Sequence, residues 1–274
     1  MQDLKSQISN FLLRIEYDGS AFCGWQSQRS EPTVQAALEE AILRATSERV
    51  RVHGAGRTDS GVHALGQAAH VKLRTALRPD QLLAALNSHL PPAVSVWSVR
   101  AVPPDFDARR SARLRTYRYH LLFRRARASL QRGMWVHFPY RVNLDRLREA
   151  AARLSGEHDF SAFRSAACTA RRTRLTLLPI GVCEAGERMM LDFSCRSFLH
   201  HMIRHMVGAL LEVARGRFDL DELESLLRGA PRPATLPLSP AHGLVLMDVY
   251  YPPEAFEEEK PSATAQDEED SDER

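Results

Sequence analysis

In the first hundred residues, apolar positions recur either at helical spacing or in the alternation typical of strands. These two patterns predict most of the secondary structure there. The stretch TVQAALEEAILRA (33–45) repeats them at helical spacing, which predicts a helix with Thr33 as its N-cap. A second helix is expected over 79–90, because Pro91 and Pro92 end its pattern. Strands are expected at 11–17, 49–55, 66–74 and 93–102.

The later part of the chain repeats this arrangement of strands and helices. Asn143 precedes an amphipathic stretch and predicts a capped helix, while Asp219 and Glu222 have the spacing of a capping box on a short helix ending at Gly229. Further elements are expected as strands at 114–123, 176–185, 189–195 and 243–251, and as helices at 143–154 and 197–216.

Four strands with two longer helices, twice over, predict an α+β protein made of two similar halves. We expect the halves to join into one continuous, mainly antiparallel sheet, with helices on one face. The expected divisions are an N-terminal extension (1–9), an N-terminal half (10–104), a C-terminal half (105–252) and a disordered acidic tail (253–274).

Charge is distributed unevenly along the 274 residues. The segment from Glu254 to Arg274 holds ten acidic and two basic residues, so it carries −8 of a total of +3 and leaves +11 for residues 1–253. After Phe256 this acidic segment contains no aromatic residue, a composition that is typical of disorder. A basic body is what a phosphate-backbone partner requires, although a GC-rich genome produces the same abundance of arginine.

Several features indicate a cytoplasmic protein. The N-terminus lacks the basic and apolar regions of a secretory signal, and no apolar run approaches the roughly 20 residues of a membrane span. The four cysteines show no zinc-ligand spacing and are expected to be free thiols.

Three segments are unusually polar for their surroundings. The turn GAGRTDSGVHALGQ (54–67) places Arg57 and Asp59 between glycines, while 106–123 and 163–174 are rich in arginine. Arginine pairs with phosphates and aromatic rings stack on bases. On the strand 114–123, Tyr117 and Tyr119 share one face, so one ring is expected to face a bound base while the other packs.

These motifs resemble one known family. GRTDSGVHALGQ (56–67), YDGSAFCGWQ (17–26), RTYRYHL (115–121), FSAFR (160–164) and FLHHMIRHMVGALLEV (198–213) are similar, in type and order, to motifs of the tRNA pseudouridine synthase A family. The resemblance covers residues 10 to 251. The differences are small: Cys23 stands where an aromatic residue is common, and the acidic tail is an addition.

The resemblance implies isomerisation of uridine to pseudouridine at positions 38, 39 and 40 in the anticodon stem-loop of tRNA. It also implies ferredoxin-like or RRM-like halves with a central RNA-binding cleft, and a catalytic loop in the N-terminal half (10–104). A homodimer, no metal and no cofactor are implied as well. Asp59 would be the catalytic nucleophile, Arg57 would assist base flipping, and Tyr117 would stack on the target base. Implied tRNA contacts are Arg78, Phe106, Asp107, Ala108, Arg109, Arg110, Ala167, Cys168, Thr169, Ala170 and Arg171.

Residue chemistry agrees with that reaction. An ionised carboxylate can attack either C1′ of the nucleoside or C6 of the base, and an arginine adjacent to Asp59 favours the ionised form. The target base must first be flipped out of its stack. The Tyr117 hydroxyl is a candidate proton acceptor for C5. Arg204, on a mostly apolar helix, is predicted to reach the cleft and pair with Asp59.

Other functions fit parts of the sequence. A non-catalytic RNA-binding protein or RNA chaperone would use the same basic surfaces without needing Asp59. A zinc hydrolase would use His201 and His205, which stand four residues apart, but the glutamate of the zinc-peptidase motif is missing. Gly54 and Gly56 resemble the start of a dinucleotide-binding loop but lack its third glycine.

Overall fold

The computed structural model of the protein describes residues 8–28 and 30–257. The longer helices are α1 (Val34–Thr46), α2 (Pro79–His89), α3 (Leu144–Leu154), α4 (Met202–Ala214) and α5 (Leu220–Leu227). The strands are β1 (Ser9–Tyr17), β2 (His53–Gly54), β3 (His63–Leu73), β4 (Val94–Val102), β5 (Leu114–Leu122), β6 (Val136–His137), β7 (Gly156–Asp159), β8 (Arg174–Leu177), β9 (Gly181–Ala185), β10 (Arg188–Cys195) and β11 (Leu244–Tyr250). Short 3₁₀ turns are η1 (Gly19–Ala21), η2 (Ser161–Phe163), η3 (Ala241–Gly243) and η4 (Pro253–Phe256).

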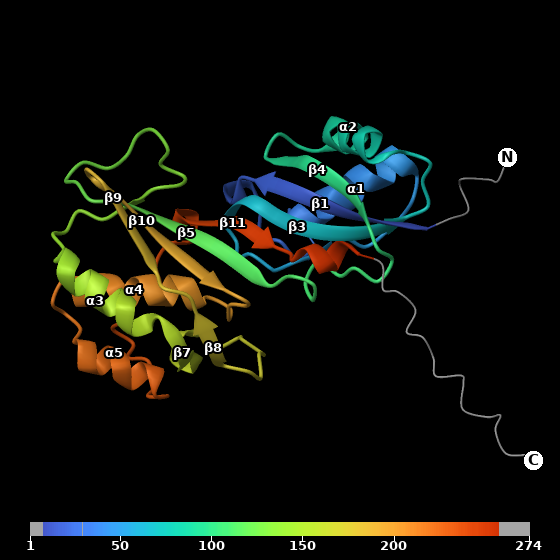
Figure 1. The fold of residues 1–274 in the computed structure, drawn as a ribbon. Coiled ribbons are helices and arrows are strands. Elements are labelled where there is room, and N and C mark those ends of the chain that lie inside the picture. The colour runs from blue at the N-terminus through green and yellow to red at the C-terminus, as the bar shows by residue number, and fades with distance from the viewer. Residues whose placement is uncertain (1–7, 29, 258–274) are drawn as a thin grey trace, which may run out of the picture.

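All these strands belong to one sheet, with the main order β4-β1-β3-β11-β5-β10-β8-β7. Strands from the first 102 residues lie at one end with α1 and α2, and the later strands lie at the other with α3, α4 and α5 (Figure 1). The last strand, β11, joins the two ends because it pairs in parallel with β3 and antiparallel with β5. The prediction of an α+β protein with a large, mostly antiparallel sheet is confirmed.

The predicted helix starts are confirmed by their caps. The Thr33 hydroxyl accepts a hydrogen bond from the backbone N–H of Ala36, and the Asn143 side chain accepts from two N–H groups of the first turn of α3. Asp219 forms the expected capping box with Glu222 at the start of α5. These contacts satisfy N–H groups that a helix leaves unpaired at its first turn.

Some predicted elements are shorter than expected. The strand predicted at 176–185 is divided into β8 and β9 around Pro179, which has no N–H to donate to a sheet. The helix predicted from residue 197 begins at Met202, since His201 has a left-handed backbone with φ 66°. The strand predicted at 49–55 is reduced to His53–Gly54, and two short strands, β6 and β7, were not predicted.

A continuous apolar core runs under the sheet. The β1 residues Leu13 and Ile15 are fully buried at one end, and Tyr119 of β5 and Phe193 of β10 are fully buried at the other. The first residues of the expected tail also pack, because Phe256 of η4 stacks on Phe106. The rest of the acidic tail and residues 1–7 lie outside the described residues.

Within the described ranges, the helices lack the combined length and apolar character needed to cross a bilayer.

Candidate active site

The turn between β2 and β3 needs glycine for steric reasons. A Cβ on Gly54 would lie 2.6 Å from the buried indole ring of Trp25, and Gly61 has a φ of +78° that favours glycine. The glycines therefore let the chain pass close to Trp25 and turn sharply after Asp59. We call residues 54–61 the catalytic loop.

Side chains from neighbouring strands hold the catalytic loop in place. The Thr58 hydroxyl shares a 2.7 Å hydrogen bond with the Tyr17 hydroxyl, and Gln67 Nε2 donates to the carbonyl of Gly56 over 3.0 Å. The backbone N–H of Trp25 donates to the carbonyl of Thr58. Burial raises the pKa of Tyr17 to about 12, so this phenol stays a neutral hydrogen-bonding group. The residues on either side of Arg57 are therefore anchored.

Three cationic or potentially cationic side chains surround the Asp59 carboxylate. Arg204 Nη1 lies 3.0 Å from Oδ2, His201 Nε2 lies 3.5 Å from Oδ2, and His200 Nε2 lies 3.3 Å from Oδ1. The Asp59 side chain is 19% exposed, so it is partly desolvated and still reachable from solvent. The predicted Arg204–Asp59 ion pair is confirmed, and we call these four residues the Asp59 cluster.

Arg204 is itself held in position. It lies in the first turn of α4, and its Nε donates to the carbonyl of Ser239 over 2.8 Å. Because Asp59 contacts the residues that begin α4, its charge also lies near the positive end of the helix dipole. The Arg204 guanidinium and the start of the helix therefore both face Asp59 with positive charge.

Arg57 is placed differently from the sequence expectation. Its side chain is exposed, and within the described chain it forms no ion pair with Asp59, although only one residue separates them. Thr58 between them points back toward Tyr17 and is buried. The guanidinium that pairs with Asp59 therefore comes from Arg204, and the exposed Arg57 side chain extends from the surface.

The two tyrosines of β5 occupy different environments. Tyr119 is fully buried and its hydroxyl donates to the carbonyl of Pro240 over 2.8 Å. Tyr117 is 7% exposed, and its ring meets Phe198 edge to face at 5.3 Å. Burial raises the pKa of Tyr117 well above its ordinary value, with Asp59 adding to the shift. A neutral phenol is a weak base, which favours a ring contact for Tyr117 over proton abstraction.

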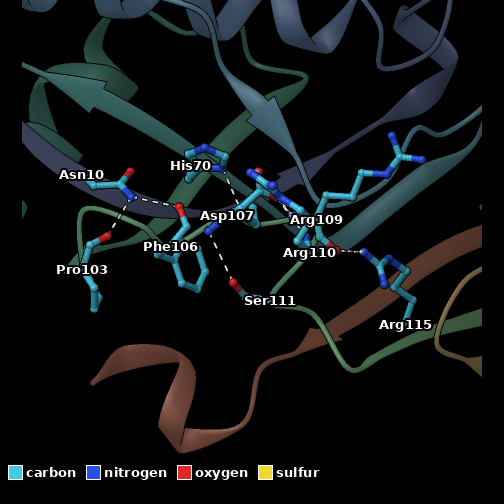
Figure 2. A network of polar contacts seen from close by, with 10 residues as sticks. Asn10, His70, Pro103, Phe106, Asp107, Arg109, Arg110, Ser111 and Arg115 are labelled. Carbon is cyan, nitrogen blue, oxygen red and sulfur yellow. Dashed lines mark hydrogen bonds and ion pairs between the residues drawn. The ribbon is translucent and has the colours of Figure 1, made fainter. Parts of the chain in front are cut away.

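The predicted RNA-contacting segment 106–110 is a turn held by hydrogen bonds, with exposed arginines (Figure 2). The Asp107 carboxylate accepts hydrogen bonds from the N–H groups of Arg109 and Arg110, and Ala108 N–H donates to His70 Nδ1. Phe106 and Ala108 are buried, so their side chains belong to the core. The exposed side chains of this segment are those of Arg109 and Arg110, and Arg110 also pairs with the Asp107 carboxylate at 3.3 Å.

The segment 167–171 lies in the loop between η2 and β8. Its residues are exposed except for half-buried Cys168, and Ser165 N–H donates to the carbonyl of His200 over 2.8 Å. This hydrogen bond places the start of the loop beside the Asp59 cluster. Arg78 is exposed at the start of α2 and pairs with Asp80. No contact in the described chain connects Arg78 to Asp59.

The histidines do not form the pair that a zinc hydrolase would use. The side chains of Asp59, His200 and His201 are close enough to share an ion, with ligand atoms within 4.8 Å of one another. His205 instead lies 6.1 Å from His201 between ring centroids, and its buried Nδ1 has no partner in the described structure. Arg204 already pairs with the carboxylate that would bind the metal.

Both of the deeper histidines favour the neutral form. Burial lowers the pKa of His205 to about 4, and the nearby Arg232, His201 and Arg204 act in the same direction. Partial burial also lowers the pKa of His201, against the opposing effect of Asp59. His200 was not singled out from the sequence. The sequence feature that could have identified His200 is its position directly before His201. The apolar pattern assigns both residues to a helix, whereas they lie in the turn before α4.

Two hollows of the described surface lie away from this cluster. One, of about 470 Å³, is lined by residues such as Glu48 and Lys72, and another, of about 330 Å³, by residues such as Arg14 and Trp97. Neither is lined by Asp59. The Asp59 cluster, which carries reactive groups, locates the candidate site better than the volume of a hollow does. The central cleft expected from the sequence stays a prediction.

Comparison with known proteins identifies the family. A family model described as tRNA pseudouridine synthase matches residues 14–109 and 150–252. Proteins named tRNA pseudouridine synthase A are similar along nearly their whole length. The relative from Methylobacterium nodulans is 47% identical over 91% of this chain and 98% of its own, and the one from Xanthobacter autotrophicus is 44% identical over 89% and 100%. The resemblance inferred from the motifs is confirmed, and the chain belongs to the tRNA pseudouridine synthase family.

Proposed function

We propose that this protein is an isomerase that converts uridine to pseudouridine in tRNA, with Asp59 as its nucleophile. The observation that carries the proposal is the ion pair between the partly exposed Asp59 carboxylate and Arg204, at 3.0 Å. The chain that holds this pair belongs to the tRNA pseudouridine synthase family. A carboxylate must be ionised to act as a nucleophile, and a fixed guanidinium favours that form.

The reaction breaks the N1–C1′ bond of uridine and forms a C5–C1′ bond, with no change in oxidation state. Asp59 attacks either C1′ or C6. Arg57 is exposed beside it and able to enter the space left by a flipped base, which offsets part of the cost of unstacking. Tyr117 offers its ring to the flipped base. These steps need neither a metal nor a cofactor.

The tRNA-binding surface is proposed to include the exposed arginines around the site. Arg109 and Arg110 project from a turn that is already rigid, so they lose little backbone freedom on binding. The loop 167–171, which starts beside His200, is the second contact, and Arg78 is the third. The family resemblance supports uridines 38, 39 and 40 of the anticodon stem-loop as targets.

The finer architecture follows the same resemblance. We infer that residues 10–104 and 105–252 are two ferredoxin-like halves, supported by the placement of their strands at opposite ends of one sheet. A homodimer and a cytoplasmic location are proposed on the resemblance to the family. Analytical ultracentrifugation of the purified chain tests the dimer, and a single species at monomer mass would exclude it.

The function is tested with unmodified tRNA transcripts and chemical mapping of pseudouridine. The wild-type protein is expected to modify uridines of the anticodon stem-loop, and Asp59→Asn is expected to abolish modification while tRNA binding persists. Asp192→Asn is a matched control, because Asp192 also pairs with an arginine, Arg118, but in a separate ion pair between β5 and β10. Binding of tRNA without modification by the wild-type protein would instead indicate an RNA-binding protein or RNA chaperone.

A further inference from the structure

Arg115 is a buried arginine outside the Asp59 cluster. It lies on β5, is 8% exposed, and within the described residues has no carboxylate at ion-pair distance. Burial lowers its pKa, although a guanidinium remains protonated in proteins. A buried charge without an acidic partner is unfavourable unless hydrogen bonds satisfy its polar atoms. The acceptors of those hydrogen bonds therefore indicate the role of Arg115.

Those acceptors are backbone carbonyls from three separate segments. Nε and Nη2 donate to the carbonyl of Ala55 at 3.3 and 2.7 Å. Nη2 also donates to the carbonyl of Arg109 at 2.9 Å, as Figure 2 shows. Nη1 donates to the carbonyl of Arg196. One planar guanidinium therefore holds together three pieces of chain that lie 54 or more residues apart in sequence, counting from 55 to 109 and from 109 to 196.

Each of the three segments leads into the candidate site. Ala55 belongs to the catalytic loop, four residues before Asp59. Arg109 belongs to the exposed RNA-binding turn. Arg196 begins the turn that carries Phe198, which packs on Tyr117, and His200, which contacts Asp59. A Cβ on Gly56 would lie 3.8 Å from Arg115 Nε, so the catalytic loop runs directly over the guanidinium.

We propose that Arg115 is a positioning residue that holds the catalytic loop in a defined place relative to the RNA-binding turn and the turn before α4. It does not touch the reacting atoms. A purely stabilising residue would be equally well served by an apolar side chain, since replacing buried ions with apolar groups often preserves stability. The fork of donors, which together reach three different segments of the site, favours a geometric role. This inference rests on the proposed role of Asp59.

The test compares Arg115→Lys and Arg115→Gln with the wild-type protein. Lysine keeps the charge but, with one nitrogen, lacks the fork that reaches all three carbonyls. We expect the single-turnover rate of pseudouridine formation at saturating tRNA to fall about 100-fold, since small misplacements of catalytic groups have effects of that size. The Kd for tRNA is expected to change less than about threefold, because the Arg109 side chain remains.

A structural readout separates this inference from the proposed reaction. Without any tRNA, hydrogen exchange in a peptide covering 54–61 is expected to rise in both variants, while exchange in α4 stays unchanged. Arg118→Lys is the matched control, because Arg118 is on the same strand but pairs with Asp192 on the other face. The control is expected to keep its rate within about twofold, as is usual for a partly exposed ion pair.

An unchanged rate in folded Arg115→Lys would overturn the proposal. So would a rate loss matched by an equal loss of tRNA affinity, or unfolding of both variants, since those results would make Arg115 a binding or stability residue. An inactive wild-type protein would count against the proposed function alone, because the exchange measurement does not depend on catalysis.

Discussion

The catalytic loop (54–61) and the turn from Arg196 to Arg204 meet at the same carboxylate, but they are built in different ways. The loop follows its path because of its own residues, since glycines allow its close passage by Trp25 and its tight turn, although Tyr17, Gln67 and Arg115 also anchor it. The turn depends on distant partners, because His200, His201 and Arg204 contact a residue more than 140 positions away in sequence. A short motif supplied Asp59, and tertiary packing supplied the charged groups around it.

The difference is clearest for the two arginines. Arg57 is two positions from Asp59 in the chain yet exposed and unpaired with it, whereas Arg204 is 145 positions away and 3.0 Å distant. Proximity in sequence is therefore a poor guide to an ion pair within a turn, where successive side chains leave the backbone in different directions.

Among the variants that test this difference, Arg204→Gln is expected to lower the rate of pseudouridine formation the most. Loss of the guanidinium leaves a partly buried carboxylate without its best partner, and we expect the single-turnover rate to fall by about 100-fold or more, as for other groups that stabilise charge in a catalytic site. Arg215→Gln is the control, because Arg215 follows the same helix, is similarly buried and pairs with Glu212. Equal rates for the two variants would contradict the role of Arg204.

His205 predicts a loss of stability in acid. Its pKa of about 4 in the folded protein lies below the ordinary 6.5, so the unfolded chain takes up a proton between these values that the folded chain does not. The free energy of unfolding should therefore fall as pH drops from 6.5 to 4, by up to about 3 kcal/mol.

Urea unfolding at several pH values, compared with His205→Asn, measures this difference. The variant is expected to lose less stability in that window because asparagine does not titrate. His89→Asn, at an exposed position at the end of α2, should behave like the wild-type protein. Parallel pH curves for wild type and His205→Asn would exclude the buried neutral histidine.

Gly54→Ala tests the catalytic loop. The added Cβ would meet the Trp25 ring at 2.6 Å, and Trp25 is nearly fully buried, so we expect a loss of about 1–3 kcal/mol from crowding. Thermal unfolding gives the measurement. Gly133→Ala is the control, since a Cβ there meets no atom within 4 Å. A stable, fully active Gly54→Ala would show that the motif is not sterically restricted.

Arg109→Ala is expected to weaken binding of all substrate tRNAs several-fold. Removal of one phosphate contact should lower the slope of log Kd against log salt concentration by about one. Filter binding between low and moderate salt gives the slope. Arg44→Ala, on the exposed side of α1 where Arg44 pairs with Glu40, should leave it unchanged. An unaltered slope in Arg109→Ala would remove this residue from the RNA surface.

Chelation is expected to have no effect at all. Asp59, His200 and His201 have donor atoms close enough to bind a metal, but pseudouridine formation needs none. Activity after dialysis against EDTA should equal that of untreated protein. A loss restored by zinc would support the metal interpretation and would make the histidines ligands.

Much of the fold was predictable because its signals are local. The Thr33 and Asn143 caps, the capping box at Asp219 and the apolar spacing of the longer helices depend on neighbouring residues, and all are confirmed. The errors in predicted secondary structure occurred where distant contacts determine whether an element forms or where it begins. Two-residue strands such as β6 exist only through pairing with β5, and the start of α4 was hidden by the unusual backbone of His201.

The sequence alone determined the family, the α+β class and the identity of the motif that carries Asp59, because residue spacing and turn chemistry are written along the chain. The pairing of Arg204 with Asp59 was also predicted from the sequence, but only the tertiary structure decided that His200 and His201 join this pair, that the exposed Arg57 side chain does not, and that the Arg115 fork joins three segments. The physical reason is that ion pairs and buried hydrogen bonds depend on distances in space, and the parallel pairing of β11 with β3 brings together parts of the chain that no local pattern relates.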